Sequence, residues 1–239
     1  MAHVDETRVV AVMPMRGGSE RVPNKNLREV AGLPLFCYGL QVLQSLSFVD
    51  EVVVNTDSVT IASAVQERFP SVSIYHRPTG LGTGSTPMTE VLTDFLSNVD
   101  AHSVLQVHST SPFVQAQSIE RAYKRFRSVS ECDSVFSVSK MQGRLWEGGM
   151  RPLNHDPQVL ERTQDLDPVF LENSAFYIFD RRMFVETQMR IGPKPIMHEL
   201  NVIESIDIDT EEDLFLAEVV ALGLSARAQL LMDGTSVDE

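Results

Sequence analysis

Cysteine is scarce in this 239-residue sequence, which contains only Cys37 and Cys132. Both lie in apolar or mixed segments, and their spacing matches no metal-binding motif, so a cysteine-based zinc site is excluded. Apolar runs of 18 residues are absent, and residues 1–6 lack the apolar core of a signal peptide. We therefore expect a soluble cytoplasmic protein with no membrane partner.

Cations are also few, with 20 Lys and Arg against 33 Asp and Glu and a formal net charge of −13. Nonspecific binding to nucleic acid needs an extended cationic face, so nucleic acid is excluded as a partner. Three of these cations, Arg16, Arg21 and Lys25, nevertheless fall within one ten-residue loop. In so acidic a chain this clustering suggests an anionic ligand.

Several common functional motifs are missing. The adjacent Gly17 and Gly18 do not form the dinucleotide-binding pattern, and no glycine-rich loop ends in Gly-Lys-Ser/Thr. Neither Ser19 nor Ser111 lies in a nucleophile elbow. His155, between Asn154 and Asp156, has no further ligands at zinc-site spacing. A Rossmann dehydrogenase, a P-loop enzyme and a serine hydrolase are therefore disfavoured.

The stretch from Val9 to Asn26 combines a short apolar run with the cationic loop. The run predicts a buried strand that ends near Pro14. Gly17 and Gly18 allow close approach of the backbone to a ligand, with successive N–H groups turned inward as in phosphate-binding loops. An ordinary surface turn with solvated charges is the alternative for this stretch taken alone.

The rest of the chain alternates short β-branched runs with amphipathic segments. We predict strands at 9–14, 50–57, 72–75, 103–108, 133–138, 175–179 and 202–209. We predict helices at 34–47, 58–69, 86–99, 118–128, 181–188 and 211–222, with Ser58 as an N-cap, Pro87 at a first helical position and a frayed tail after Ala226. Such alternation predicts one α/β domain over residues 1–239, with a mostly parallel sheet and helices on both faces.

The alternation stops after residue 139, where glycines and prolines punctuate a polar segment around Trp146. Long irregular stretches of this kind are usually functional or form an interface. We assign residues 139–200 as an irregular insertion.

Polar clusters follow four of the predicted strands, at 16–25, 55–57, 108–111 and 207–209. Ligands of open α/β sheets bind beyond the carboxyl ends of the strands, so these clusters are expected to converge. Asp207 and Asp209, two apart on a predicted strand, would project from one face and suit Mg²⁺. The alternative is that Asp209 or Thr210 only caps the last helix, with Thr210 and Asp213 forming a capping box.

Seven segments together resemble the acylneuraminate cytidylyltransferases, which make CMP-activated sialic acids and related nonulosonates. These segments are MPMRGGSERVPNKN (13–26), VVNTD (53–57), RP (77–78), TSP (110–112), RTQD (162–165), ENSAFY (172–177) and SIDIDT (205–210). The resemblance covers nearly the whole chain and implies a three-layer, Rossmann-like nucleotide-diphospho-sugar transferase fold with a dimerisation or lid insertion.

The resemblance implies that the anomeric hydroxyl of a 2-keto sugar acid attacks the α-phosphorus of CTP and expels pyrophosphate. It places the catalytic roles on Arg16, Lys25 and Asp209, with Mg²⁺ held by Asp207 and Asp209. Nucleotide contacts fall to Gly17, Gly18, Ser19, Asn26 and Arg77. Sugar contacts fall to His108, Arg144, Arg162, Asn173 and Tyr177.

Three departures from the family pattern lie near these positions. His108 stands where many members have a glutamine, Val114 replaces an arginine, and residues 81–84 lack a common aspartate. They bear on which sugar is used and leave the chemistry unchanged.

Family members are typically homodimers in which an irregular segment enters the neighbouring site, and residues 139–169 and 189–198 are the candidates here. A self-contained lid is the alternative for these segments. A CMP-KDO synthetase and a nucleotide-binding module without catalysis are the alternative functions.

Overall fold

A computed structural model describes residues 7–232 of the chain, and its centre is a seven-stranded sheet. The spatial order is β5 (Ser73–His76), β4 (Glu51–Thr56), β1 (Val9–Met15), β6 (Ser103–Val107), β8 (Val169–Asp180), β7 (Ser134–Met141) and β9 (Pro195–Leu200). A separate hairpin joins β2 (Glu29–Val30) to β3 (Leu33–Pro34).

Four parallel and two antiparallel pairings make up the main sheet, so the predicted mostly parallel sheet is confirmed. After β1 the chain builds β4 and β5 on one side and then returns to place β6 on the other. This reversal leaves a crevice beyond the carboxyl ends of β1 and β6, where α/β folds bind ligands.

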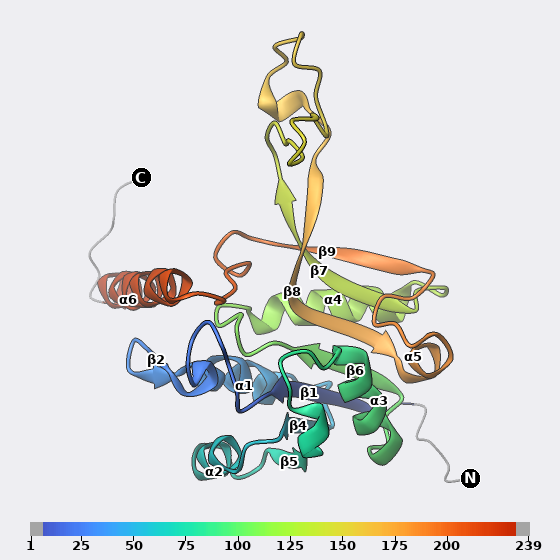
Figure 1. The fold of residues 1–239 in the computed structure, drawn as a ribbon, viewed down its shortest axis with the longest axis vertical. Coiled ribbons are helices and arrows are strands. Elements are labelled where there is room, and N and C mark those ends of the chain that lie inside the picture. The colour runs from blue at the N-terminus through green and yellow to red at the C-terminus, as the bar shows by residue number, and fades with distance from the viewer. Residues whose placement is uncertain (1–6, 233–239) are drawn as a thin grey trace.

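Helices cover both faces of the sheet and form two separate cores (Figure 1). One core includes apolar residues of α1 (Leu35–Ser45), α2 (Val59–Arg68) and α4 (Ala116–Ser128). The other includes residues of α3 (Met88–Asn98) and α5 (Arg181–Thr187). The architecture is therefore the predicted three-layer one.

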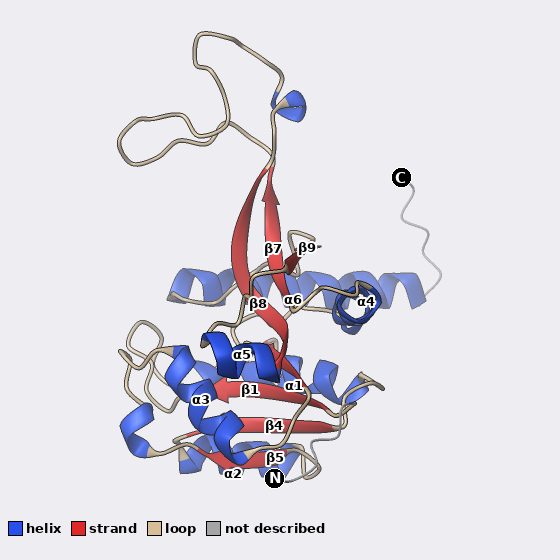
Figure 2. Ribbon diagram, turned by 90° about the vertical axis from the view of Figure 1, so that its right-hand side faces the viewer, coloured by secondary structure: helices blue, strands red, loops and turns tan. Residues whose placement is uncertain are grey.

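Strands β7 and β8 continue past the sheet as a projecting arm, which ends in residues 142–168 (Figure 2). The insertion assigned to residues 139–200 contains the regular elements β8, α5 and β9, of which a strand at 175–179 and a helix at 181–188 were expected and β9 was not. The long irregular stretch is residues 142–168, apart from the 3₁₀ turn Thr163–Asp165 and a bridge between Trp146 and Pro152, and residues 188–194 form a shorter loop between α5 and β9. Two further 3₁₀ turns, Lys25–Leu27 and Thr79–Leu81, lie in the loops near the crevice.

The prediction of a strand at 202–209 was wrong. The last strand is β9, and residues 201–210 cross the end of the sheet without pairing in it. Buried Ile208 anchors this segment: its N–H donates to the Thr110 carbonyl at 2.9 Å, and its side chain packs with Val22 and Phe113. Apolar alternation identified the burial correctly but not the backbone pairing.

Two helix boundaries also differ from the predictions. Pro87 is the N-cap of α3, so the helix begins one residue later. Helix α6 (Glu211–Met232) extends past Leu222 and Ala226, so the expected fraying at Ala226 was wrong within the described residues.

Helix α6 is apolar on nearly all sides, and by length and composition alone it could cross a membrane. No segment able to cross a membrane was expected from the sequence, and α6 is an exception by length and composition. A single helix of this kind is weak evidence that the protein spans a membrane. Leu214, Ala217 and Ala221 pack on the folded domain, and Glu218 accepts a hydrogen bond from the Ala31 N–H at 2.6 Å. The contacts therefore attach α6 to the β2–β3 hairpin.

We predict that Ser58→Ala lowers the free energy of unfolding by about 1 kcal/mol. The predicted N-cap is confirmed, since Ser58 Oγ accepts a hydrogen bond from the Ile61 N–H at 3.3 Å. Urea unfolding followed by circular dichroism measures the effect. Ser63→Ala, at an exposed position of the same helix, is the control and should leave stability equal or slightly higher because alanine favours helices.

Candidate active site

A cavity of about 310 Å³ lies beyond the carboxyl ends of β1 and β6. The side chains around it come from the loops after these two strands and from the segment between β5 and α3. They are Pro14, Arg16, Ser19, Lys25, Asn26, Arg77, Leu81, Thr83, Gly84, Thr86, Met88, Val91, His108, Ser109 and Thr110. The expected convergence of the 16–25 and 108–111 clusters is therefore observed.

The glycine loop is fixed by contacts with its neighbours. The Gly17 N–H donates to Asp57 Oδ1 at 2.8 Å, and a Cβ on Gly17 would lie 2.9 Å from the Ser58 Cβ. Gly17 thus serves close packing of two loops, and its N–H is engaged by Asp57. Gly18 faces open space, since a Cβ there would meet nothing within 4 Å.

Two buried side chains position the cavity wall. Asn26 donates to the Arg16 carbonyl at 3.1 Å and accepts from Ser109 Oγ at 2.6 Å, which links the loops after β1 and β6. Arg77 donates to the Asn55 side-chain oxygen at 2.8 Å and to its carbonyl at 3.0 Å. Burial lowers the pKa of Arg77, but arginine remains charged at any ordinary pH.

Asp209 bridges the cationic loop and the C-terminal segment. Its two carboxylate oxygens lie 2.9 Å from Lys25 Nζ and 2.9 Å from an Arg21 nitrogen, and Lys25 also donates to the Ile208 carbonyl at 2.7 Å. Burial acts to raise the pKa of Asp209, but Lys25 and then Arg21 hold it below its ordinary value. Asp209 is therefore ionised at neutral pH.

The predicted capping box is also present, and it does not use the Asp209 side chain. Asp213 accepts from the Thr210 N–H at 2.7 Å and the Asp209 N–H at 3.0 Å, while the Asp213 N–H donates to Thr210 Oγ1 at 3.2 Å. Because Thr210 and Asp213 cap α6, the carboxylate of Asp209 is free to face the cations.

Asp207 lies on the other side of buried Ile208. Burial raises the pKa of Asp207, a hydrogen bond with Thr110 opposes this, and the charge of Asp209 adds to it. Among residues 7–232 no group of three or more His, Cys, Asp and Glu side chains could hold a metal ion. Two neighbouring carboxylates near a cavity lined by Arg16 and Lys25 do fit Mg²⁺, which takes most of its shell from water and substrate phosphates.

His108 belongs to a polar cluster at the rim of the cavity. Its Nε2 lies 2.7 Å from Gln106 Nε2, whose amide orientation is set by Arg190 donating to Gln106 Oε1 at 3.4 Å. Gln106 is then the donor, so Nε2 accepts and Nδ1 carries the proton. Burial, followed by the charge of Arg190, lowers the pKa of His108 to about 4, while Asp209 opposes the shift. His108 is thus neutral at pH 7.

A β-bulge in β8 places the other predicted sugar residues. Opposite Phe136 and Val138 of β7 stand Tyr177 and Glu172, so the four residues of β8 between them have no partner in β7, and Ser174 has a φ of 58°. Bulges re-aim side chains beside active sites. Here the bulge directs Tyr177 Oη to the Glu172 carboxylate and to Ser174 Oγ.

Burial raises the pKa of Tyr177 to about 12, so its hydroxyl stays protonated. Asn173, in the bulge, donates to Ser139 Oγ at 3.1 Å and Ser205 Oγ at 3.3 Å. Asn173 therefore joins the base of the arm to the segment that carries Asp207.

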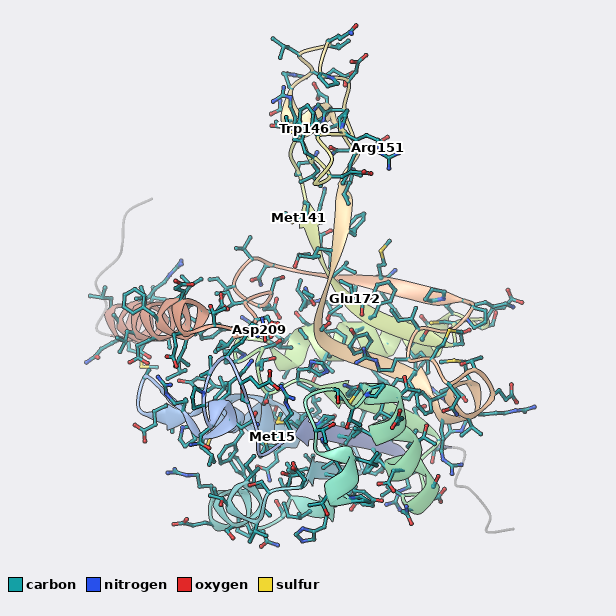
Figure 3. All side chains as sticks on the ribbon, viewed as in Figure 1. Met15, Met141, Trp146, Arg151, Glu172 and Asp209 are labelled. Atoms are coloured by element: carbon teal, nitrogen blue, oxygen red, sulfur yellow. The ribbon has the colours of Figure 1, made fainter. Side chains whose placement is uncertain are left out.

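Arg144 and Arg162 are separated from this cluster, because both belong to the irregular part of the arm. Arg144 donates to the Glu161 carbonyl, and Arg162 forms an ion pair with Asp165 at 2.7 Å. Figure 3 shows Trp146 and Arg151 of the same segment far out on the arm, while Asp209 lies at the sheet. The chain does not bring these two arginines to its own cavity.

Sequence reasoning missed three contributors: Gln106, Arg190 and the structural role of Asp57. Asp57 was noted in a cluster at a strand end but given no role. Gln106 lies inside a strand, where alternation assigns it to the core, and Arg190 lies in a segment without a motif. Only the antiparallel pairing of Gln106 with Tyr177 brings these elements together, and no local pattern predicts that pairing.

A mostly parallel sheet with a cationic glycine loop close to two carboxylates suits an enzyme that acts on a nucleotide phosphate. The family model described as cytidylyltransferase matches residues 10–234. The chain belongs to this family, which confirms the resemblance drawn from the motifs.

Individual relatives agree with this assignment. The chain is 32% identical over 227 residues to the CMP-N,N'-diacetyllegionaminic acid synthase of Legionella pneumophila, an alignment covering 88% of this chain and 95% of the relative. It is 23% identical to the pseudaminic acid cytidylyltransferase of Campylobacter jejuni, with 88% and 95% covered. It is 28% identical to the N-acylneuraminate cytidylyltransferase of Oncorhynchus mykiss, covering 90% of this chain but only half of that protein.

Solved structures show the same fold. A CMP:2-keto-3-deoxy-manno-octonic acid synthetase complexed with CTP aligns with a TM-score of 0.67 at 15% identity, covering 90% of this chain and 99% of that one. The 4-diphosphocytidyl-2C-methyl-D-erythritol synthase from Anaerococcus prevotii aligns with a TM-score of 0.64 at 14% identity, covering 92% and 98%. The predicted nucleotidyltransferase fold is confirmed.

We predict that His108→Gln weakens the acid sensitivity of folding. The pKa of His108 is about 4 in the folded protein against 6.5 for the free side chain, so the unfolded chain binds more protons between these values. Stability from the buried neutral ring is present above pH 6.5 and is lost as the pH falls toward 4, up to about 3 kcal/mol.

Urea unfolding at several pH values between 7 and 4 tests this prediction. The free energy of unfolding should fall less in His108→Gln than in the wild type. His76→Gln, which changes an exposed histidine at the end of β5, should behave as the wild type. An unchanged pH dependence in His108→Gln would contradict the buried neutral ring.

Proposed function

We propose that this protein transfers CMP from CTP to the anomeric hydroxyl of a nonulosonic acid and releases pyrophosphate. The observation that carries the proposal is a cavity at the carboxyl edge of the sheet that Arg16 and Lys25 line, with Asp209 hydrogen-bonded to Lys25. Relatives named for legionaminic, pseudaminic and N-acylneuraminic acids support the substrate class.

The chain's own residues supply positioning and charge. Arg16 and Lys25 line the cavity, and their positive charges stabilise the negative charge of the triphosphate and of the departing pyrophosphate. Lys25 is held in place by Asp209 and the Ile208 carbonyl, so it need not reorganise during the reaction. Phosphoryl transfer depends mainly on such positioning and electrostatic stabilisation.

The reaction as proposed uses Mg²⁺, for which Asp207 and Asp209 are the ligands that the chain offers. When bound, the ion would neutralise phosphate charge and polarise the α-phosphate. Arg21 and Lys25 keep the Asp209 carboxylate ionised, the form that a cation needs.

His108 is a poor proton acceptor for the sugar hydroxyl, because its pKa of about 4 makes it a weak base at pH 7. His108 is better suited to hydrogen bonding with the sugar through its Nδ1–H. A carboxylate or a bound water then serves as the acceptor.

We further propose a homodimer in which the arm of one protomer completes the sugar site of the other. The arm exposes large apolar side chains to solvent, among them Met150 at 81% and Leu160 at 89%. Arg144 and Arg162 lie on this arm, outside the cavity of their own chain, so their expected sugar contacts require a second copy. A cytoplasmic setting agrees with the two free cysteines, Cys37 and Cys132.

A CMP-KDO synthetase activity is the alternative, favoured by the structural similarity to such an enzyme. The test is pyrophosphate release from CTP and Mg²⁺ with a panel of legionaminic, pseudaminic, N-acetylneuraminic and KDO acids. Turnover with KDO alone would favour the alternative. Calorimetric binding of CTP without turnover on any acid would indicate a module that has lost catalysis.

We predict that Asp209→Ala reduces turnover by at least about a thousandfold, since it removes both a metal ligand and the group that positions Lys25. The pyrophosphate assay with the best acid of the panel measures this loss. Glu211→Ala is the control, because this neighbouring exposed carboxylate pairs with Arg28 and not with Lys25 or Arg21. Retained activity in Asp209→Ala, with an unchanged circular dichroism spectrum, would refute the proposed role.

We predict that Leu160→Asp converts a dimer to a monomer, because it places a charge in the apolar surface of the arm. Light scattering after size exclusion measures the mass. Val59→Asp alters an apolar side chain that is 75% exposed on α2 and should leave the dimer intact. A monomeric wild-type protein would rule out the shared site.

A further inference from the structure

Arg190 lies between α5 and β9, next to the polar cluster at the cavity rim. Its guanidinium carbon lies 3.9 Å from the centre of the Tyr177 ring, and it donates to Gln106 Oε1 at 3.4 Å. Gln106 in turn contacts His108, which lines the cavity. Arg190 therefore lies next to the part of the cavity wall that His108 forms and against Tyr177, one of the residues expected to contact the sugar.

The contacts of Arg190 are all with neutral groups. Within residues 7–232 no ion pair includes it, although carboxylates outnumber cations in the chain. Arginine has five N–H donors, and the stacking on Tyr177 uses none of them. A guanidinium held flat against an aromatic ring, with donors left over, is preorganised to receive a planar oxyanion in two parallel hydrogen bonds.

The cations near the cavity belong to two groups of residues. Lys25 and Arg21 are paired with Asp209 beside the glycine loop. Arg190 instead lies against Tyr177 of β8 and Gln106 of β6, close enough to His108 for its charge to lower the pKa of that ring. A ligand whose phosphate binds at the glycine loop can therefore present a second anion to Arg190.

We propose that Arg190 is a specificity-determining residue that binds the carboxylate of the sugar acid. This inference rests on the proposed function, in which the acceptor is a 2-keto sugar acid. Its carboxylate is attached to the carbon that bears the attacking hydroxyl. When Arg190 binds this carboxylate through two hydrogen bonds, it also orients the attacking hydroxyl. Gln106 and Tyr177 hold the guanidinium in place.

The test compares a sugar acid with its neutral primary carboxamide as acceptors, in the wild type and in Arg190→Met. We expect the wild type to prefer the acid in kcat/KM. Arg190→Met should raise KM for the acid by about ten- to a hundredfold, leave KM for CTP within about twofold, and abolish the preference for acid over amide. Arg190→Lys, which keeps the charge but not the planar fork, should retain part of that preference.

Arg182→Met is the matched control, because Arg182 is exposed on α5 and pairs with Glu186. It should keep the wild-type values for both acceptors. An equal loss for acid and amide in Arg190→Met would assign Arg190 a structural role and overturn the inference, as would an unchanged KM. A wild type that turns over no sugar acid would overturn the proposed function, and the inference with it, whereas the other results leave the proposed function standing.

Discussion

The ion pair between Lys25 and Asp209 joins residues 184 positions apart in the chain. Lys25 Nζ is largely shielded from solvent, with 12% of the side chain exposed, so the pair is worth more than a free surface contact. Because Lys25 also donates to the Ile208 carbonyl, the C-terminal segment cannot leave without exposing the loop cation. The cationic loop and the C-terminal carboxylates thus form one unit, although they belong to two loops far apart in the sequence.

This unit explains which parts of the molecule could be predicted. The buried strand β1, the Ser58 cap and the Thr210–Asp213 capping box depend on neighbours close in sequence, and each was found from the sequence. Asp207 and Asp209 were expected near the cationic loop, and Asp209 does contact Lys25, but the segment that carries them is not the predicted strand. Alternation around Ile208 reports burial, and burial is produced equally by a strand or by an extended segment anchored through one residue.

Long-range pairing sets the remaining part of the site. Gln106, Tyr177 and Arg190 meet because β8 runs antiparallel to β6 and carries a four-residue bulge opposite β7. The antiparallel pairing puts Gln106 beside Tyr177, and the bulge turns the Tyr177 hydroxyl toward Glu172. Neither register nor bulge leaves a local pattern, since the same residues would fit an unbroken strand. The resemblance to a family supplied Tyr177 and Asn173, but Arg190 came only from the structure.

The cluster also shows why a neutral histidine suits this position. A protonated His108 would stand beside the Arg190 guanidinium in a buried setting, and the repulsion together with the loss of hydration keeps the ring neutral. A neutral ring that accepts from Gln106 leaves one N–H to offer, as a glutamine amide would. The substitution of histidine for the family's glutamine therefore keeps a donor at the cavity wall while Arg190 supplies the charge. In this arrangement the two residues act together: His108 sets the shape of the cavity wall, and Arg190 sets the charge of the ligand that fits.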